Sequence, residues 1–289
     1  MCGIVGIVSN KSVSASIISA LKKLEYRGYD SAGISTLING QIKEQKCSGR
    51  VDNLEKILFQ NPSSGDLGIG HVRWATHGVP NQVNAHPHSS EAVSVVHNGI
   101  IENSDTLRNE YKEKGYSFKS QTDTEVITIM LTDFLKQNDL INCIHKTLKK
   151  LEGSFALGII FKDYNNLVVG ARRGSPLAVG YGHNENFIGS DSYALKSMTN
   201  KISYLDDGNF CILYKEKVEF YNSDKKKINK EIFELSYEDN TAEKGDYRDF
   251  MSKEINEQSY TTKKCINEYL NTSKNEIDIL NLPLEAKKI

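Results

Sequence analysis

The sequence predicts an α+β protein with one large domain and a shorter segment after it. Short strand-like runs alternate with helix-like runs from the N-terminus to about residue 240, and the alternation has no fixed repeat. Most strand candidates are bounded by Gly, Asn or Asp, which is typical of antiparallel strands. The length of 289 residues, at roughly 100 to 200 residues per domain, leaves room for one large domain, or one domain plus a fragment.

The first elements are indicated by apolar runs near the N-terminus. Residues 2–8 are apolar and interrupted by glycines, which predicts a buried strand. A helix is expected over residues 12–24, because Ile17, Ile18, Leu21 and Leu24 recur at helical spacing. The next strands are predicted at residues 32–38, 67–73 and 92–96.

The clearest helix signal is Thr122-Asp-Thr-Glu125, a capping-box pattern that precedes an apolar face at helical spacing. A second helix is expected over residues 139–151, ending before Gly153. Further strands are predicted at residues 155–161, 167–171, 201–204, 210–214 and 217–221.

The composition changes after Tyr221. A lysine-rich, polar stretch with few large apolar residues indicates a connector over residues 222–243. Residues 244–270 regain weak helical periodicity. The predicted organisation is therefore a domain over residues 2–221, this connector, and a further segment over residues 244–289.

The composition argues against several classes of protein. The chain has 36 Lys and Arg against 37 Asp and Glu, and the net charge of −1 is not that of a general binder of nucleic acid or anionic membranes. No apolar run approaches the roughly 18 residues of a membrane helix, and the N-terminus lacks a signal-peptide pattern, so a cytoplasmic protein is expected. The five Cys show no CxxC pairing, which fits reduced thiols better than disulfides or zinc.

No cofactor or metal is expected. The sequence has neither a Walker motif nor a GxGxxG motif after a strand. His86-Pro-His88, with His77 and His97 nearby, invites a metal interpretation, but no HExxH or Cys-His set has ligand spacing. A loop of this composition is more often simply polar and structured.

Cys2 is the first candidate for chemistry, because removal of Met1 would leave it with a free α-amino group. An α-amine has a pKa of about 7.7 to 8.0 and a free thiol one of about 8.5, so proton transfer between them costs about 1 kcal/mol or less. A nucleophile that uses its own N-terminal amine as base is a known mode of activation. The alternative is a small buried hydrophobe on a strand, as for most free cysteines.

His97-Asn98-Gly99 follows the strand predicted at residues 92–96. Asn-Gly between apolar runs is a leading signal for a hairpin turn. A tight turn would also expose the backbone N–H of Gly99 beside the Asn98 carboxamide, and two such neutral donors can hold an oxyanion. Both interpretations are compatible.

Arg73 and Asp123 are candidates for binding the two ends of an α-amino acid. Arg73 stands beside the only Trp of the chain, Trp74, and can form a bidentate pair with a carboxylate. Asp123, at the start of the capped helix, can bind an ammonium group. The alternatives are a surface salt bridge for Arg73 and an interaction with the helix dipole for Asp123.

Several motifs, in order along the chain, resemble the glutaminase domain of the glutamine-fructose-6-phosphate aminotransferase family. They are MCGIVG at residues 1–6, LEYRGYDSAG at 24–33, GHVRWATHG at 70–78, NAHPH at 84–88, VHNGIIEN at 96–103 and QTDTE at 121–125. The resemblance covers residues 2 to about 258. The second and third motifs point to this family rather than to amidotransferases that make phosphoribosylamine or asparagine.

The resemblance implies an N-terminal nucleophile hydrolase fold, a four-layer αββα sandwich of two antiparallel sheets. It implies that L-glutamine is hydrolysed to glutamate and ammonia through a thioester on Cys2, with the oxyanion held by Asn98 and Gly99. It further implies binding of the substrate by Arg73, Thr76, His77 and Asp123, with Trp74 gating the ammonia route and Arg27 in a loop near the nucleophile.

The resemblance breaks down near the C-terminus. Residues 244–258 are similar to the segment that leads into the family's sugar-isomerase half, although Asp249 and Ser259 replace an expected His and Pro. The residues that follow are far fewer than the roughly 200 that two isomerase domains need. Glucosamine 6-phosphate synthesis from fructose 6-phosphate would then need a separate sugar-isomerase half. The alternatives are an inactive or partner-dependent truncated module, or another amide hydrolase of the same fold.

Overall fold

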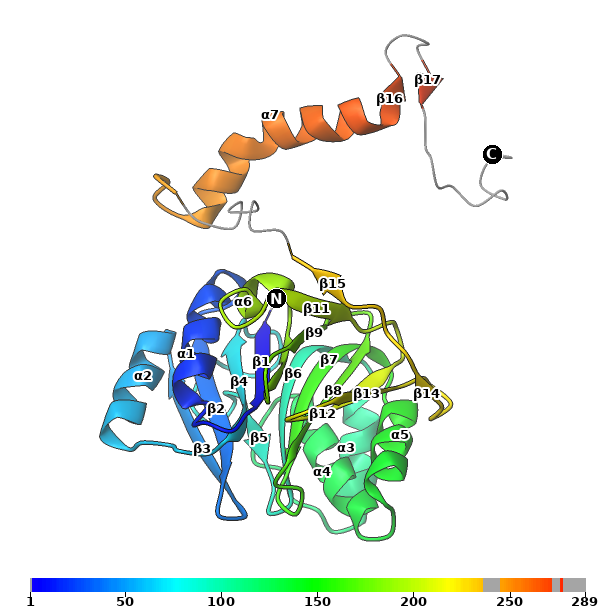
Figure 1. The fold of residues 1–289 in the computed structure, drawn as a ribbon. Helices are drawn as coiled ribbons and strands as arrows, with labels where there is room; N and C mark the ends of the chain where they lie inside the picture. The colour runs from blue at the N-terminus through cyan, green and yellow to red at the C-terminus, as the bar shows by residue number, and fades with distance from the viewer. Residues whose placement is uncertain (1, 236–244, 272–275, 278–289) are drawn as a thin grey trace. The chain divides into compact units, whose positions relative to one another are not determined.

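The computed structural model describes residues 2–235, 245–271 and 276–277. By its internal contacts the chain divides into two units, Met1–Ser236 and Tyr237–Ile289. Figure 1 draws both, and each is described here by itself.

The first unit contains a sheet of eight strands, all paired antiparallel. Its order is β15-β11-β9-β10-β1-β4-β2-β3. The strands are β1 (Gly3–Val8), β2 (Ser31–Ile38), β3 (Gln41–Ser48), β4 (Leu67–Arg73), β9 (Ala178–Tyr181), β10 (Asn186–Gly189), β11 (Lys201–Tyr204) and β15 (Phe233–Glu234). The strand that begins one residue after Cys2 therefore lies in the interior of the sheet, beside β4.

A second antiparallel sheet of seven strands has the order β14-β13-β12-β8-β7-β6-β5. Its strands are β5 (His88–Ser89), β6 (Val93–Ile101), β7 (Gly153–Phe161), β8 (Leu167–Arg173), β12 (Phe210–Tyr214), β13 (Val218–Tyr221) and β14 (Lys227–Ile228). The longest pairing joins β6 to β7, from Val93 opposite Phe161 to Ile101 opposite Gly153.

Helices cover the outer face of each sheet (Figure 1). The first sheet is covered by α1 (Ser14–Lys23), α2 (Val51–Gln60) and the short α6 (Ser192–Leu195), and the second by α3 (Ser104–Glu113), α4 (Thr124–Leu135) and α5 (Leu140–Lys150). In β1, Ile4 and Val8 belong to the core between the sheets, whereas Val5 and Ile7 belong to the core under the helices. This alternation gives four layers, helix, sheet, sheet and helix, and confirms the predicted fold class.

The structure also contains elements that the apolar pattern does not indicate. Strand β3 (QIKEQKCS) is a polar edge strand, and α3 buries only Leu107 and Tyr111. The stretch predicted as a connector carries β14, which pairs with β13, and β15, which pairs with β11. That stretch therefore extends both sheets up to residue 235, and residues 236–243 lie outside the described part.

The second unit is built around α7 (Phe250–Tyr269). Asp249 caps this helix by accepting a hydrogen bond from the Ser252 backbone N–H at 2.8 Å, so the unexpected Asp at this position makes a good helix start. A short pair of strands follows, β16 (Leu270–Asn271) and β17 (Glu276–Ile277). Within the described residues, no helix has the length and apolar character needed to cross a membrane.

Candidate active site

The ends of three neighbouring strands, β1, β4 and β2, determine which residues surround the candidate nucleophile Cys2. β4 lies between β1 and β2, with Gly3 opposite Val72 and Ser31 opposite Arg73. Three residues that flank these strands therefore lie close together at one end of the sheet: Cys2 before β1, Asp30 before β2 and Trp74 after β4. The register of the sheet thus sets the position of the thiol.

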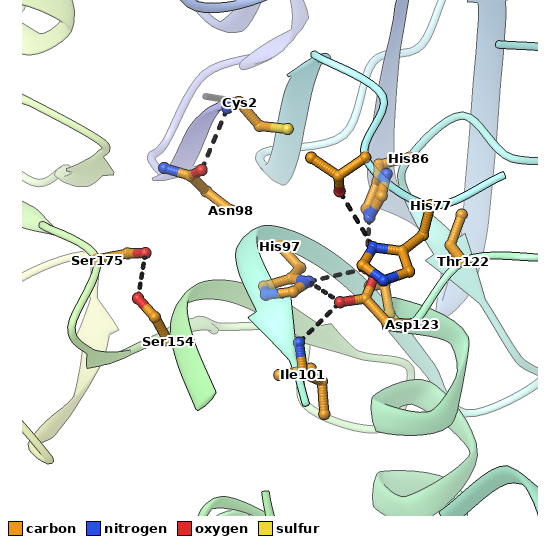
Figure 2. Close-up of polar contacts among 12 residues, drawn as sticks. Cys2, His77, His86, His97, Asn98, Ile101, Thr122, Asp123, Ser154 and Ser175 are labelled. Atoms are coloured by element: carbon orange, nitrogen blue, oxygen red, sulfur yellow. Dashed lines mark hydrogen bonds and ion pairs between the residues drawn. The ribbon is translucent and has the colours of Figure 1, made fainter. Parts of the chain in front are cut away.

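Cys2 is half-buried and contacts two partners through different atoms. The Trp74 backbone N–H donates to the Cys2 Sγ at 3.4 Å, and the Cys2 backbone nitrogen donates to the Asn98 Oδ1 at 3.2 Å (Figure 2). Burial raises the pKa of the Cys2 thiol, while the hydrogen bond from Trp74 and the charge of Arg73 lower it. Residue 1 lies outside the described part of the chain.

The predicted hairpin turn at Asn98-Gly99 is wrong. β6 continues through both residues to Ile101, with Asn98 opposite Ala156 and Gly99 opposite Phe155. Gly99 has φ +147°, and a Cβ at this position would lie 2.0 Å from the Ser154 carbonyl oxygen. The pairing with β7 outweighs the local turn preference of Asn-Gly, and glycine is needed because no side chain fits.

Arg73 ends β4 and is buried, with 3% of its surface exposed. Its guanidinium donates to the carbonyl oxygens of His77, Gly78 and Val79, the last two at 3.2 and 3.5 Å. No described carboxylate pairs with it, so the surface salt bridge considered as an alternative is not formed. In this state Arg73 holds the loop that follows it.

Asp123 is buried directly before α4. Its Oδ2 accepts a hydrogen bond from the Ile101 backbone N–H at 2.8 Å and lies 4.0 Å from the His97 Nδ1. Its side chain makes no capping hydrogen bond and instead links the start of α4 to β6.

The helix predicted from the capping box is present, but that box is not formed. The Glu125 carboxylate instead accepts from the backbone N–H groups of Lys119 and Ser120 at 2.8 and 2.7 Å. Thr122 contacts the His88 Nε2 at 2.9 Å. The loop before α4 therefore folds back onto Glu125.

The structure brings most of the predicted site residues around one narrow pocket. Cys2, Arg73, Gly99 and Asp123 line it together with Trp74, Thr76 and His77, and Asn98 joins through its contact with Cys2. The free volume is about 10 Å³, which is the room of roughly one water.

Arg27 is the exception among the predicted residues. It ends a short 3₁₀ helix, Glu25–Arg27, and its Nε donates to the Asp191 Oδ2 at 3.0 Å. Only 11% of its side chain is exposed. Its described contacts tie the 3₁₀ helix to the start of α6 rather than to the pocket.

Comparison with known proteins gives a consistent family. A model described as glutamine amidotransferase domain matches residues 71–197. Glutamine-fructose-6-phosphate aminotransferase (isomerizing) of Mesorhizobium japonicum is 46% identical over the whole chain, which covers 48% of that protein. This chain contains a class II glutamine amidotransferase domain. It is homologous to the N-terminal half of these aminotransferases and spans about half of their length.

Other matches agree with this assignment. The relative of the same name from Clostridium acetobutylicum is 50% identical over 89% of this chain and 43% of its own. Among solved structures, the glutamine phosphoribosylpyrophosphate amidotransferase of B. subtilis has a TM-score of 0.64 at 24% identity, covering 77% of this chain and 49% of that one. A glutamine aminotransferase class-II domain protein of Silicibacter pomeroyi has a TM-score of 0.56 at 12% identity, over 76% of this chain and 99% of its own. Identities this low show the fold alone.

Four buried histidines lie behind the pocket of the amidotransferase domain. The His71 and His86 rings stack with centroids 4.2 Å apart, and the His86 and His88 rings meet edge-on at 4.7 Å. The Thr124 hydroxyl contacts both the His86 Nε2, at 2.7 Å, and the His97 Nδ1, at 2.9 Å. Because a hydroxyl has one proton, Thr124 donates to one ring and accepts from the other.

Burial keeps these rings neutral. It lowers the pKa of His71 to about 3, and it lowers the pKa values of His86, His88 and His97 as well. No set of three or more potential ligands among the described residues is arranged to hold a metal ion. The histidines form a packed floor of the pocket, and the sequence indicated it only as a local abundance of His.

Asp30 and Gly28 were missed as site residues. The Asp30 carboxylate accepts a hydrogen bond from the Ala75 backbone N–H, and a Cβ on Gly28 would lie 2.7 Å from the Trp74 nitrogen. Both residues belong to the LEYRGYDSAG motif, directly before β2, which was the available signal.

Proposed function

We propose that this domain hydrolyses L-glutamine to glutamate and ammonia, with Cys2 as the nucleophile. The observation that carries the proposal is the contact of the Cys2 backbone nitrogen with the Asn98 Oδ1, beside a pocket that Arg73, Gly99 and Asp123 also line. Once Met1 has been removed, that nitrogen is an α-amine. It then lies on the nucleophile's own residue, where it can take the thiol proton.

The chemistry proceeds in two stages. The Cys2 thiolate attacks the side-chain amide of glutamine, and the α-amine returns the proton to the departing ammonia. Because the Asn98 Oδ1 is held by the Cys2 nitrogen, the Asn98 Nδ2 is the group that donates to the oxyanion, together with the Gly99 N–H. Loss of one such donor typically costs about 10²- to 10³-fold in rate. Water then hydrolyses the glutamyl thioester and regenerates the thiol.

Substrate recognition uses the two buried charges. Arg73 binds the glutamine carboxylate in place of its present contacts with the carbonyl oxygens of residues 77–79. Asp123 binds the ammonium group. Thr76 and His77, which are exposed and contact each other at 3.2 Å, line the opening. Trp74 is placed by its backbone at the thiol and gates the route by which ammonia leaves.

The proposal also names the molecule that accepts the ammonia. Relatives named glutamine-fructose-6-phosphate aminotransferase are about twice as long, so we infer that fructose 6-phosphate is aminated in a sugar-isomerase half, which corresponds to the part of those proteins outside the match. The side chains of Met251, Ile255, Ile266 and Tyr269 share one face of α7, and each is at least 45% exposed. This apolar face supports contact with such a half.

A partner-dependent domain is the second candidate. It is favoured by the narrow pocket and by the contacts of Arg73 with its own loop, since both describe a closed site. In that case addition of a separately expressed sugar-isomerase half should raise glutamine turnover. A cytoplasmic location is also proposed, and the free state of Cys2, Cys47, Cys143, Cys211 and Cys265 supports a reducing compartment.

Release of glutamate and ammonia from L-glutamine tests the proposal, with Cys2→Ala as the matched control. We expect turnover that disappears in the variant. Intact mass should show that active protein has lost Met1, and active protein that retains Met1 would contradict the amine mechanism. Turnover of other amides lacking one end charge would favour a different amide hydrolase.

A further inference from the structure

One residue outside the predicted site holds the backbone beside the nucleophile from both sides. The Asp30 N–H donates to the Arg73 carbonyl oxygen at 3.1 Å, and the Asp30 carboxylate accepts from the Ala75 N–H. Between these two points lies Trp74, whose N–H donates to the Cys2 Sγ at 3.4 Å. The donor that faces the sulfur is therefore fixed on each side by the same residue.

We propose that Asp30 is a positioning residue for the nucleophile, which clamps the Arg73–Ala75 backbone so that the Trp74 N–H points at the Cys2 sulfur. This inference rests on the proposed role of Cys2. It gives Asp30 no contact with glutamine, and the group that acts on the thiolate is the Trp74 peptide.

The clamp is itself well supported. The Ser31 hydroxyl donates to the Asp30 Oδ1 at 3.0 Å, and the Asp30 carbonyl oxygen accepts from the Gly49 N–H at 2.7 Å. Both carboxylate oxygens and both backbone groups of Asp30 are thus engaged. Ser31 pairs with Arg73 in the sheet, so Asp30 is held at the level of Trp74 by the strand that follows it.

Gly28 constrains the same peptide from another direction. A Cβ at this position would lie 2.5 Å from the Arg73 carbonyl carbon and 2.7 Å from the Trp74 nitrogen. The chain can pass this close to the Trp74 peptide only without a side chain. Residues 28–30 therefore shape the backbone at the thiol through a missing side chain and two hydrogen bonds.

The charge of Asp30 and the hydrogen bond that Asp30 positions have opposite effects on the pKa of the Cys2 thiol. A carboxylate near Cys2 raises the pKa of the thiol, whereas the hydrogen bond from Trp74 lowers it. Asp30 therefore does not favour the thiolate through its charge, and any benefit must come from the position of the Trp74 N–H. This opposition allows the two effects to be separated by substitution.

Asp30→Asn and Asp30→Ala remove the same charge, but only Asn keeps an acceptor for the Ala75 N–H. The measurement is the pH dependence of Cys2 alkylation by iodoacetamide in the full chain, in a Cys265→Ser background because Cys265 is the exposed cysteine among those described. We expect an apparent thiol pKa about one to two pH units higher in Asp30→Ala than in Asp30→Asn. In Asp30→Ala the Trp74 N–H is no longer held toward the Cys2 sulfur, so the thiolate loses that hydrogen bond. Equal values in the two variants would overturn the proposal.

Two controls keep the result interpretable. Asp163→Ala removes an exposed carboxylate from the turn between β7 and β8 and should leave the alkylation profile unchanged. If Asp30→Ala does not fold, as judged by circular dichroism, Gly28→Ala displaces the same peptide and should raise the thiol pKa, and an unchanged value there would contradict the clamp. Alkylation does not require glutamine, so a wild type that fails to hydrolyse glutamine would refute the proposed function and leave this result standing.

Discussion

The two walls of the pocket are built in different ways. The inner wall consists of β6, the start of α4 and the histidines behind them. Most of its side chains are buried, and its elements are joined by strand pairing or hydrogen bonds. The outer wall is the loop after β4, where Trp74, Thr76 and His77 are exposed. Asp30 holds the first residues of this loop, and the Arg73 guanidinium holds the carbonyl oxygens of residues 77–79. The groups proposed for chemistry are thus fixed by the fold, whereas those proposed for admission of glutamine are held by contacts that a substrate can replace.

The largest effect should come from a side chain inserted into the inner wall. Gly99→Ala would place a Cβ 2.0 Å from the Ser154 carbonyl oxygen at φ +147°. We expect the variant to lose about 10²- to 10³-fold in glutamine turnover through the displaced N–H, and to unfold at a lower temperature. Gly115→Ala is the matched control, since it also has positive φ but meets no atom within 4 Å. Equal effects of the two substitutions would show that the inner wall is no more rigid than a surface turn.

Acid should weaken the inner wall through its neutral histidines. The pKa of His71 is lowered to about 3 in the folded state from an ordinary value near 6.5, so protons bind the unfolded chain more tightly. The contribution of such a group is fully present above about pH 6.5 and is lost as the pH falls toward 3, at roughly 1.4 kcal/mol per pH unit in the folding free energy. Urea unfolding measured between pH 7 and 4 should show this slope, and His71→Gln should reduce it. The exposed His183 provides the control substitution, and equal slopes in the wild type and His71→Gln would disprove the assignment.

Asp123→Asn should separate binding from chemistry. Asn keeps an oxygen that can accept from the Ile101 N–H, so the link to β6 survives while the charge for the substrate ammonium is removed. We expect KM for glutamine to rise about 10- to 100-fold with a smaller change in kcat. An unchanged KM would remove Asp123 from the binding site.

The smallest effect is expected in the outer wall. Thr76→Ala removes an exposed hydroxyl whose described contact is with the His77 ring, at 3.2 Å. Stability should change by no more than about 0.5 kcal/mol, and KM by only a few-fold. A loss of stability comparable to that of Gly99→Ala would show that the loop after β4 is as firmly built as the inner wall.

The sequence predicted elements well where the residues alternate or recur with a clear period. The predicted bounds at residues 67–73, 201–204 and 210–214 agree with the structure. Polar edge strands such as β3 were missed, because a strand at the border of a sheet does not need an apolar face. The turn at Asn98-Gly99 failed for a different reason, since pairing with a distant strand overrode the local preference.

In the site, too, residues with a recognisable local pattern could be predicted, whereas a residue whose role depends on neighbouring strands could not. Cys2, Arg73, Gly99 and Asp123 could be predicted because their chemistry and the family resemblance single them out, and the structure places them around one pocket. Asp30 could not, because its proposed role depends on which strand ends are neighbours in the sheet. A carboxylate that binds backbone N–H groups has no distinctive sequence pattern.

The edge strand β15 has a mechanical consequence. It is attached to β11 by two residue pairs, Lys201 with Glu234 and Ile202 with Phe233, and the ladder continues through β9 and β10 to β1, directly after Cys2. Tension applied to the chain after residue 235 would peel this short strand away before it could shear the longer pairs. Three strands, β11, β9 and β10, therefore separate this short edge strand from the strand next to the thiol.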